Sequence, residues 1–78
     1  MVHHLDELAL NEEAYVVGFS ADSDAGYRRQ LMRMGVLPNT RIRITRVAPL
    51  GDPMELTVRG YRLTLRRAEA AVIQVERV

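Results

Sequence analysis

Alternating apolar and polar residues predict about five short β-strands along the chain. The five runs lie at residues 13–19, 40–47, 54–59, 61–66 and 72–76. The first run is rich in β-branched and aromatic residues, which favour strands. In the second run the alternation breaks near Arg46, where we expect a β-bulge. Gly60 separates the third run from the fourth, which predicts a hairpin.

One short α-helix is predicted between the first two strands. It can start near Asp24, in a segment rich in residues that cap helix N-termini. Tyr27, Leu31 and Met34 follow at the spacing of one helical face. Gly35 fits the left-handed position after the last turn, so the helix should end there.

A second helical segment, residues 67–71, is long enough for only one turn and precedes the last strand. Short strands with one solvent-facing side, in so small a chain, suggest a mainly β protein that closes into a small barrel and so removes exposed edges. We expect the 78 residues to form a single domain, since this length has room for one hydrophobic core. Residues 1–12 are expected to be a less ordered N-terminal segment.

The composition restricts the class of protein. Hydrophobic residues make up 47% and charged residues 27%, which is typical of a soluble globular chain, and the net charge is only +1. All eleven basic residues are arginine, which fits either a genomic bias or a use in interfaces. The absence of cysteine excludes disulfides and thiolate metal sites. No apolar run is long enough to span a membrane and no export signal is recognisable, so we expect a cytoplasmic protein.

Catalytic residues are scarce. His3 and His4 are the only histidines, and no serine or cysteine lies near them as a nucleophile. Two adjacent histidines supply at most two metal ligands, so we expect a solvated tail here rather than a metal site. We therefore predict a protein that is not an enzyme and has no catalytic, metal or cofactor site.

The strand arginines raise the question of nucleic-acid binding. Arg41 and Arg43 share one strand face, and small barrels bind single strands through a basic groove with exposed aromatic residues. Each aromatic residue of this chain falls at the same periodic positions as its apolar neighbours, so we expect these side chains to lie in the hydrophobic core. They are Tyr15, Phe19, Tyr27 and Tyr61. A solvated, salt-bridged sheet face is therefore the favoured interpretation, with a small nucleic-acid-binding barrel as an alternative.

The loop at residues 48–53, APLGDP, is the most distinctive segment. Its two prolines restrict the backbone and reduce the entropy lost when the loop is ordered. Leu50 lies at its apex and has two possible roles. It folds back to cap the core, or the loop rigidly presents one apolar anchor and one carboxylate to a partner.

Several segments, in this order and spacing, resemble the FeoA family. They are residues 31–38 (LMRMGVLP), 46–53 (RVAPLGDP), 58–67 (VRGYRLTLRR), 69–71 (EAA) and 73–75 (IQV). The resemblance implies an SH3-like barrel that binds the cytosolic part of the FeoB permease and modulates ferrous iron transport. It implies association with membranes only through FeoB, no nucleic-acid partner, and allows a weak homo-oligomer.

By residue match, the resemblance implies two groups of partner-binding residues. The first is the loop Leu50, Gly51, Asp52 and Pro53, and the second is Tyr27 and Leu31 on the predicted helix. Two alternatives stay open. One is an adaptor or regulatory module related to the C-terminal domains of iron-dependent repressors. The other is a GTPase-activating role with an arginine supplied to FeoB.

Overall fold

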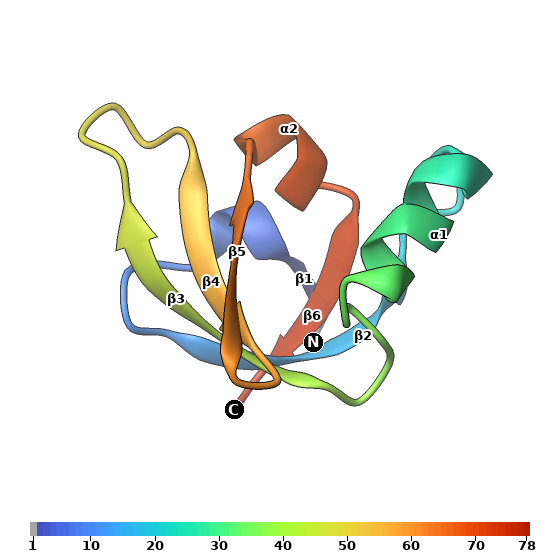
Figure 1. Cartoon of the computed structure of the whole chain (residues 1–78), viewed down its shortest axis with the longest axis horizontal. Helices are drawn as coiled ribbons and strands as arrows, with labels where there is room; N and C mark the ends of the chain where they lie inside the picture. Colours follow the sequence, from blue (N-terminus) through green and yellow to red (C-terminus); the bar gives the residue numbers. More distant parts are fainter. Residues whose placement is uncertain (1) are drawn as a thin grey trace.

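Six antiparallel strands form one strongly curled sheet in the computed structural model, which describes residues 2–78 (Figure 1). The strands are β1 (His3–His4), β2 (Glu13–Phe19), β3 (Arg41–Val47), β4 (Met54–Val58), β5 (Tyr61–Leu65) and β6 (Ile73–Arg77). The helices are the 3-10 helix η1 (Leu5–Glu7), α1 (Ala25–Arg33) and α2 (Arg67–Ala70). The predicted mainly β fold, with a short helix after residues 13–19 and a one-turn helix before the last strand, is confirmed.

The strand order is β1-β6-β2-β3-β4-β5. Strands β1 and β5 end the sheet and do not pair with each other, so the barrel is not closed by hydrogen bonds. Helices η1 and α2 contact each other and contribute the buried side chains of Leu5 and Ala70 to the hydrophobic core.

Strands β3 and β4 follow the predicted alternation, and β5 follows it at Leu63 and Leu65 but not at the exposed Tyr61. Ile42 and Ile44 of β3 pair with Val58 and Leu56 of β4, and all four side chains are buried. The register shifts between Ile44 and Arg46, which confirms the predicted bulge and centres it on Thr45. The predicted hairpin is also confirmed.

Helix α1 begins and ends where its local sequence predicts. The Asp24 carboxylate accepts a hydrogen bond from the Tyr27 backbone N–H at 2.9 Å and so caps the N-terminus. Gly35 has a φ of 99° directly after the Met34 C-cap, a conformation that costs glycine little.

The expectation that Tyr15 of β2 belongs to the core was wrong, because the opposite face of the strand turns inward. Ala14 and Val16 are buried, whereas Tyr15 and Val17 on the opposite face are 40% and 41% exposed. Strand β2 is apolar on both faces, so its alternation could not indicate which face turns inward. Its pairing with β3 and β6 decides this, for example by placing Val16 opposite the buried Val75.

The aromatic residues were also only partly core. Phe19 and Tyr27 are partly buried and pack against the core, but Tyr15 and Tyr61 are exposed. Tyr61 lies beside α1, where its hydroxyl donates a hydrogen bond to the Met34 carbonyl. A single aromatic residue at a half-exposed strand position thus ties the β5 hairpin to the helix end.

The N-terminal segment differs most from its prediction. Residues 1–12 were expected to be less ordered, yet His3 and His4 pair with Val75 and Gln74 of β6. Leu5 and Leu8 are almost completely buried in the core. These contacts join the described part of the segment to the fold and add the sixth strand.

Within residues 2–78, no helix has the length and apolar character needed to cross a bilayer.

Candidate partner-binding loop

The loop between β3 and β4 projects from one end of the barrel (Figure 1). Leu50, at its apex, is 97% exposed. The side chain therefore does not fold back onto the core, which excludes one of the two roles left open by the sequence. A fully exposed leucine leaves its apolar surface in water and is available to a partner.

Backbone hydrogen bonds hold the loop in shape. The Gly51 N–H donates to the Ala48 carbonyl at 2.7 Å, and the Ala48 N–H donates to the Pro53 carbonyl at 3.1 Å. Gly51 has a φ of 87°, which a residue with a side chain adopts only with strain. These bonds, together with the two prolines, limit the conformations open to the segment that carries Leu50.

Arg67 ties the loop to the rest of the molecule. Its side chain donates from Nε to the Gly51 carbonyl at 2.6 Å and from Nη1 to the Asp6 carbonyl at 2.5 Å. Its backbone N–H donates to Asp52 Oδ1 at 3.0 Å. Arg67 thus links the loop, α2 and η1.

Sequence reasoning missed the role of Arg67. Its partners Gly51 and Asp6 are 16 and 61 residues away along the chain, so no local spacing indicates it. The interpretation of Asp52 also changes, because its carboxylate already accepts a hydrogen bond at the start of α2. Of the two groups that the loop was predicted to present to a partner, the Leu50 side chain is therefore more available than the Asp52 carboxylate.

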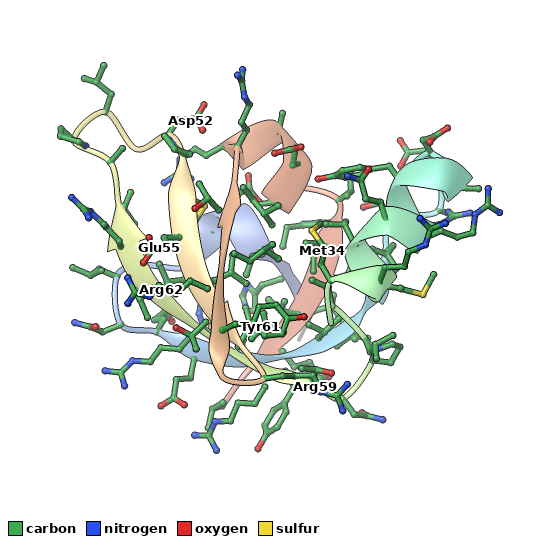
Figure 2. The ribbon with its side chains drawn as sticks, viewed as in Figure 1. Met34, Asp52, Glu55, Arg59, Tyr61 and Arg62 are labelled. Atoms are coloured by element: carbon green, nitrogen blue, oxygen red, sulfur yellow. The ribbon has the colours of Figure 1, made fainter. Side chains whose placement is uncertain are left out.

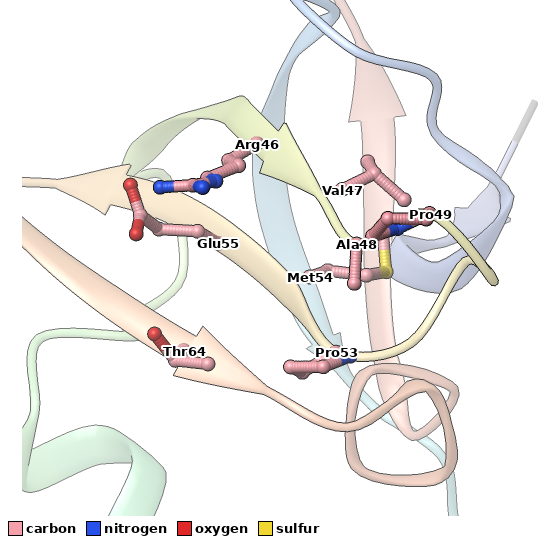
Figure 3. Close-up of a pocket in the computed structure, with 8 residues that line it drawn as sticks. All are labelled: Arg46, Val47, Ala48, Pro49, Pro53, Met54, Glu55 and Thr64. Atoms are coloured by element: carbon pink, nitrogen blue, oxygen red, sulfur yellow. The ribbon is translucent and has the colours of Figure 1, made fainter.

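A cavity of about 430 Å³ lies at the base of the loop (Figure 3). Its lining residues are Arg46, Val47, Ala48, Pro49, Pro53, Met54, Glu55 and Thr64. Arg46 and Glu55 are register partners on β3 and β4 and form its polar end, while the alanine, valine and prolines form an apolar end towards the loop. This arrangement offers a partner an apolar recess next to the Leu50 apex.

The two helix residues predicted to bind a partner lie away from the loop. Figure 1 places α1 and the loop on opposite sides of the barrel. Leu31 is 0% exposed, so its side chain packs in the core and cannot touch a partner's surface; this part of the prediction was wrong. A leucine at this position of a short amphipathic helix faces the sheet, because the helix buries only one side.

Tyr27 is half-buried on the same helix. Burial and, next in size, the negative charge of Glu69 on α2 raise the pKa of Tyr27 to about 12. Its hydroxyl oxygen is buried and has no hydrogen-bond partner among the described residues. The side chain packs against the hydrophobic core and does not form a contact surface together with Leu50.

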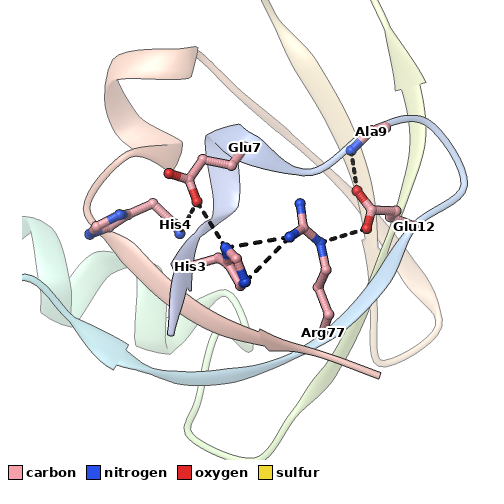
Figure 4. Close-up of polar contacts among 6 residues, drawn as sticks. All are labelled: His3, His4, Glu7, Ala9, Glu12 and Arg77. Carbon is pink, nitrogen blue, oxygen red and sulfur yellow. Dashed lines mark hydrogen bonds and ion pairs between the residues drawn. The ribbon is translucent and has the colours of Figure 1, made fainter. Parts of the chain in front are cut away.

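His3 belongs to a cluster of polar side chains rather than to a solvated tail, and His4 contributes its backbone N–H to the same cluster (Figure 4). His3 Nδ1 lies 3.4 Å from Glu7 Oε1, and Arg77 Nη1 lies 3.3 Å from His3 Nε2. Arg77 Nε also contacts Glu12 Oε2 at 2.7 Å. These contacts join β1, η1 and β6.

Hydrogen bonds keep the two glutamates of this cluster ionised. The His4 backbone N–H lowers the pKa of Glu7. The Ala9 backbone N–H, followed by the Arg77 guanidinium, lowers the pKa of Glu12. In the part of the chain that the structure describes, no three histidine, cysteine or acidic side chains gather as a set of metal ligands.

The arginine face of the sheet is partly salt-bridged, as expected. Arg41 Nε contacts Glu13 Oε1 at 2.8 Å, and its guanidinium lies 5.7 Å from the centre of the Tyr15 ring. The exposed Tyr15 ring is therefore covered on one side by Arg41.

Comparison with known proteins finds similar sequences over almost the whole chain. Residues 3–77 match the model of the FeoA domain. A fusion of Fe(2+) transport protein A with Fe(2+) transporter FeoB from Porphyromonas gingivalis is 32% identical over 72 residues, which are 92% of this chain. The chain spans only 8% of the length of that relative.

Solved structures agree with this match. The FeoA-like protein of Clostridium acetobutylicum is 38% identical, with a TM-score of 0.87 over 99% of this chain and 87% of its own. The zinc-complexed FeoA of Stenotrophomonas maltophilia, described as a prokaryotic SH3 domain protein, is 26% identical. Its TM-score is 0.82 over 95% of this chain and 89% of its own. The predicted SH3-like fold is thus confirmed.

Proposed function

Because the chain belongs to the FeoA family, we propose that it is a non-enzymatic accessory of ferrous iron transport that binds the cytosolic region of FeoB. The fused relative supports this partner, since one polypeptide there carries both an Fe(2+) transport protein A and an Fe(2+) transporter FeoB. In this role the protein acts in the cytoplasm as a single domain and reaches the membrane through FeoB.

The observation that carries this proposal is the exposed Leu50 on a braced loop. Burying a leucine side chain against a partner contributes about 1.5–3 kcal/mol, or roughly a tenfold to hundredfold gain in affinity. The Arg67 bond to the Gly51 carbonyl holds the loop before binding, so little conformational entropy is lost on association. A rigid loop with one apolar apex is the arrangement expected of an interaction hot spot.

The proposed contact surface includes fewer of the predicted residues than the sequence suggested. It comprises Leu50 with the neighbouring loop residues and the recess beside Pro49 and Pro53. Leu31 and Tyr27 support the fold from α1 and lie outside this surface.

Replacing Leu50 with a charged residue tests the proposal. Leu50→Asp is expected to leave the thermal unfolding of the protein unchanged, because the side chain touches nothing in the core. It should weaken binding to the purified cytosolic region of FeoB about tenfold or more, as measured by calorimetry. Leu10→Asp is the matched control, since Leu10 is 54% exposed and distant in sequence from the loop. Equal affinities of the two variants would remove the loop from the interaction.

The consequence for FeoB is measured separately. GTP turnover by FeoB, with and without this protein, reports whether the contact stimulates or restrains the GTPase. A modulating accessory changes the rate in a way that Leu50→Asp abolishes and Leu10→Asp retains. An unchanged rate at saturating protein would contradict modulation while leaving the binding result intact.

A further inference from the structure

Strand β5 leaves one edge of the sheet unpaired. Among residues 2–78 it pairs only with β4, through a two-residue turn at Arg59 and Gly60 in which both residues have positive φ. In such a hairpin the closing pair, Val58 and Tyr61, exchanges both hydrogen bonds, and every second residue after it faces the partner strand. The backbone groups of Arg62 and Thr64 therefore point away from β4.

These four backbone groups are free for a partner. Within residues 2–78, no loop, turn or side-chain hydrogen bond involves the N–H or the carbonyl of Arg62 or of Thr64. Both residues are exposed. An exposed row of unpaired donors and acceptors is a template for one more strand.

Positive charge surrounds this edge. Arg62 lies on β5 itself, and Arg59 and Arg66 flank the two ends of the strand. None of these three arginines forms an ion pair in the described chain. Figure 2 shows Arg62 and Glu55 projecting on the same side of the β4–β5 hairpin.

The nearby carboxylates do not neutralise this charge. Glu55 is opposite Thr64, and Glu69 accepts a hydrogen bond from the Arg66 backbone at 2.8 Å. Against three arginines, Arg59, Arg62 and Arg66, these two glutamates leave an excess of positive charge.

The same charge disfavours pairing of two copies of the chain. Two β5 edges side by side would bring two sets of unpaired arginines together, and like charges across a strand pair are destabilising. A strand that carries carboxylates at alternate positions would instead place one of them beside Arg62.

We propose that the β5 edge binds an extended acidic segment of a partner protein as an added antiparallel strand. The backbone of Arg62 and Thr64 supplies up to four hydrogen bonds, and the surrounding arginines select carboxylates. This surface is centred on β5 and not on the Leu50 loop, although Thr64 also lines the recess at the base of that loop. It does not depend on the proposed binding of FeoB.

Capped synthetic peptides test the proposal with the whole chain. The probe alternates glutamate and threonine. One control replaces each glutamate by lysine, and a second keeps the glutamates but replaces each threonine by proline, which cannot pair. Amide NMR titration of the isotope-labelled protein is expected to shift the Arg62 and Thr64 signals with the probe and to slow their hydrogen exchange. Both controls should bind at least about tenfold more weakly.

Protein variants complete the experiment. Arg62→Glu should weaken binding of the probe about tenfold or more, while Leu50→Asp should leave its affinity unchanged. The proposal is overturned if the proline-containing acidic peptide binds as well as the probe, since charge alone then suffices. It is also overturned if the shifts map elsewhere, or if Arg62 and Thr64 are protected by self-association without peptide.

Discussion

Arg67 is predicted to hold the Leu50 loop in place, and Arg67→Ala tests this directly. The substitution removes the bonds from Nε to the Gly51 carbonyl and from Nη1 to the Asp6 carbonyl. It retains the backbone bond to Asp52, because alanine still has an N–H. The loop would then be attached to α2 at one point instead of two.

The expected loss in the free energy of unfolding follows from the two hydrogen bonds that the Arg67 side chain no longer makes. A hydrogen bond from a charged donor contributes about 1.5–3 kcal/mol when buried. Arg67 is only partly buried, so water replaces part of each bond, and we expect a loss of about 1–3 kcal/mol in the free energy of unfolding. For a domain of this size that corresponds to a fall in Tm of roughly 4–20 °C.

Two measurements check this prediction. Thermal unfolding gives the loss of stability, and ¹⁵N relaxation should show the order parameters of the Leu50 and Gly51 amides falling below about 0.6. Arg66→Ala is the matched control, because the exposed Arg66 side chain precedes the same helix and makes no side-chain hydrogen bond in the described structure. If both variants unfold at the same temperature and the loop amides stay rigid, the bracing role is wrong.

Three further predictions concern the fold around the site. Gly35→Ala should cost about 2–4 kcal/mol, since its Cβ would meet the Tyr61 hydroxyl at 2.8 Å in a left-handed backbone. Gly60 has an equally left-handed backbone, but no atom lies within 4 Å of the place that its Cβ would take, so Gly60→Ala should lower the free energy of unfolding by only about 1–2 kcal/mol. Equal losses for the two variants in urea unfolding would refute the steric argument. Leu5→Ala should destabilise the protein by about 2–4 kcal/mol, whereas a truly disordered terminus would tolerate it without change. The pKa of Glu12 is lowered in the folded protein, so the ionised carboxylate stabilises the fold above the ordinary glutamate pKa of about 4.3. This stability is lost as the pH falls through the lower pKa of the folded state. Glu12→Gln should reduce the loss of stability on the acid side, as measured by unfolding at a series of pH values.

The strands, the hairpin and both ends of α1 were predictable because their signals are local. Alternation in β3 and β4 places Ile44 and Leu56 inward, and the Asp24 cap and the left-handed Gly35 act within a few residues of themselves. The loop was recognisable for the same reason, since two prolines and a glycine act on their own backbone.

Other features had no local signal. Strand β2 is apolar on both faces, so only its neighbours decide that Val16 is buried and Tyr15 is not. On α1, the periodicity that marked Tyr27 and Leu31 as one face could not distinguish a face that binds a partner from one that packs on the core.

The Leu50 loop has some features that follow from its local sequence and others that depend on the tertiary structure. The sequence alone determined that a stiff turn with a leucine at its apex joins two strands, because proline and glycine restrict the chain at their own positions. Only the tertiary structure decided that Leu50 points into solvent and that Arg67 braces the loop. The physical reason is that these outcomes depend on groups far apart in the chain, Asp6, Gly51 and Arg67, which meet only when the barrel has formed.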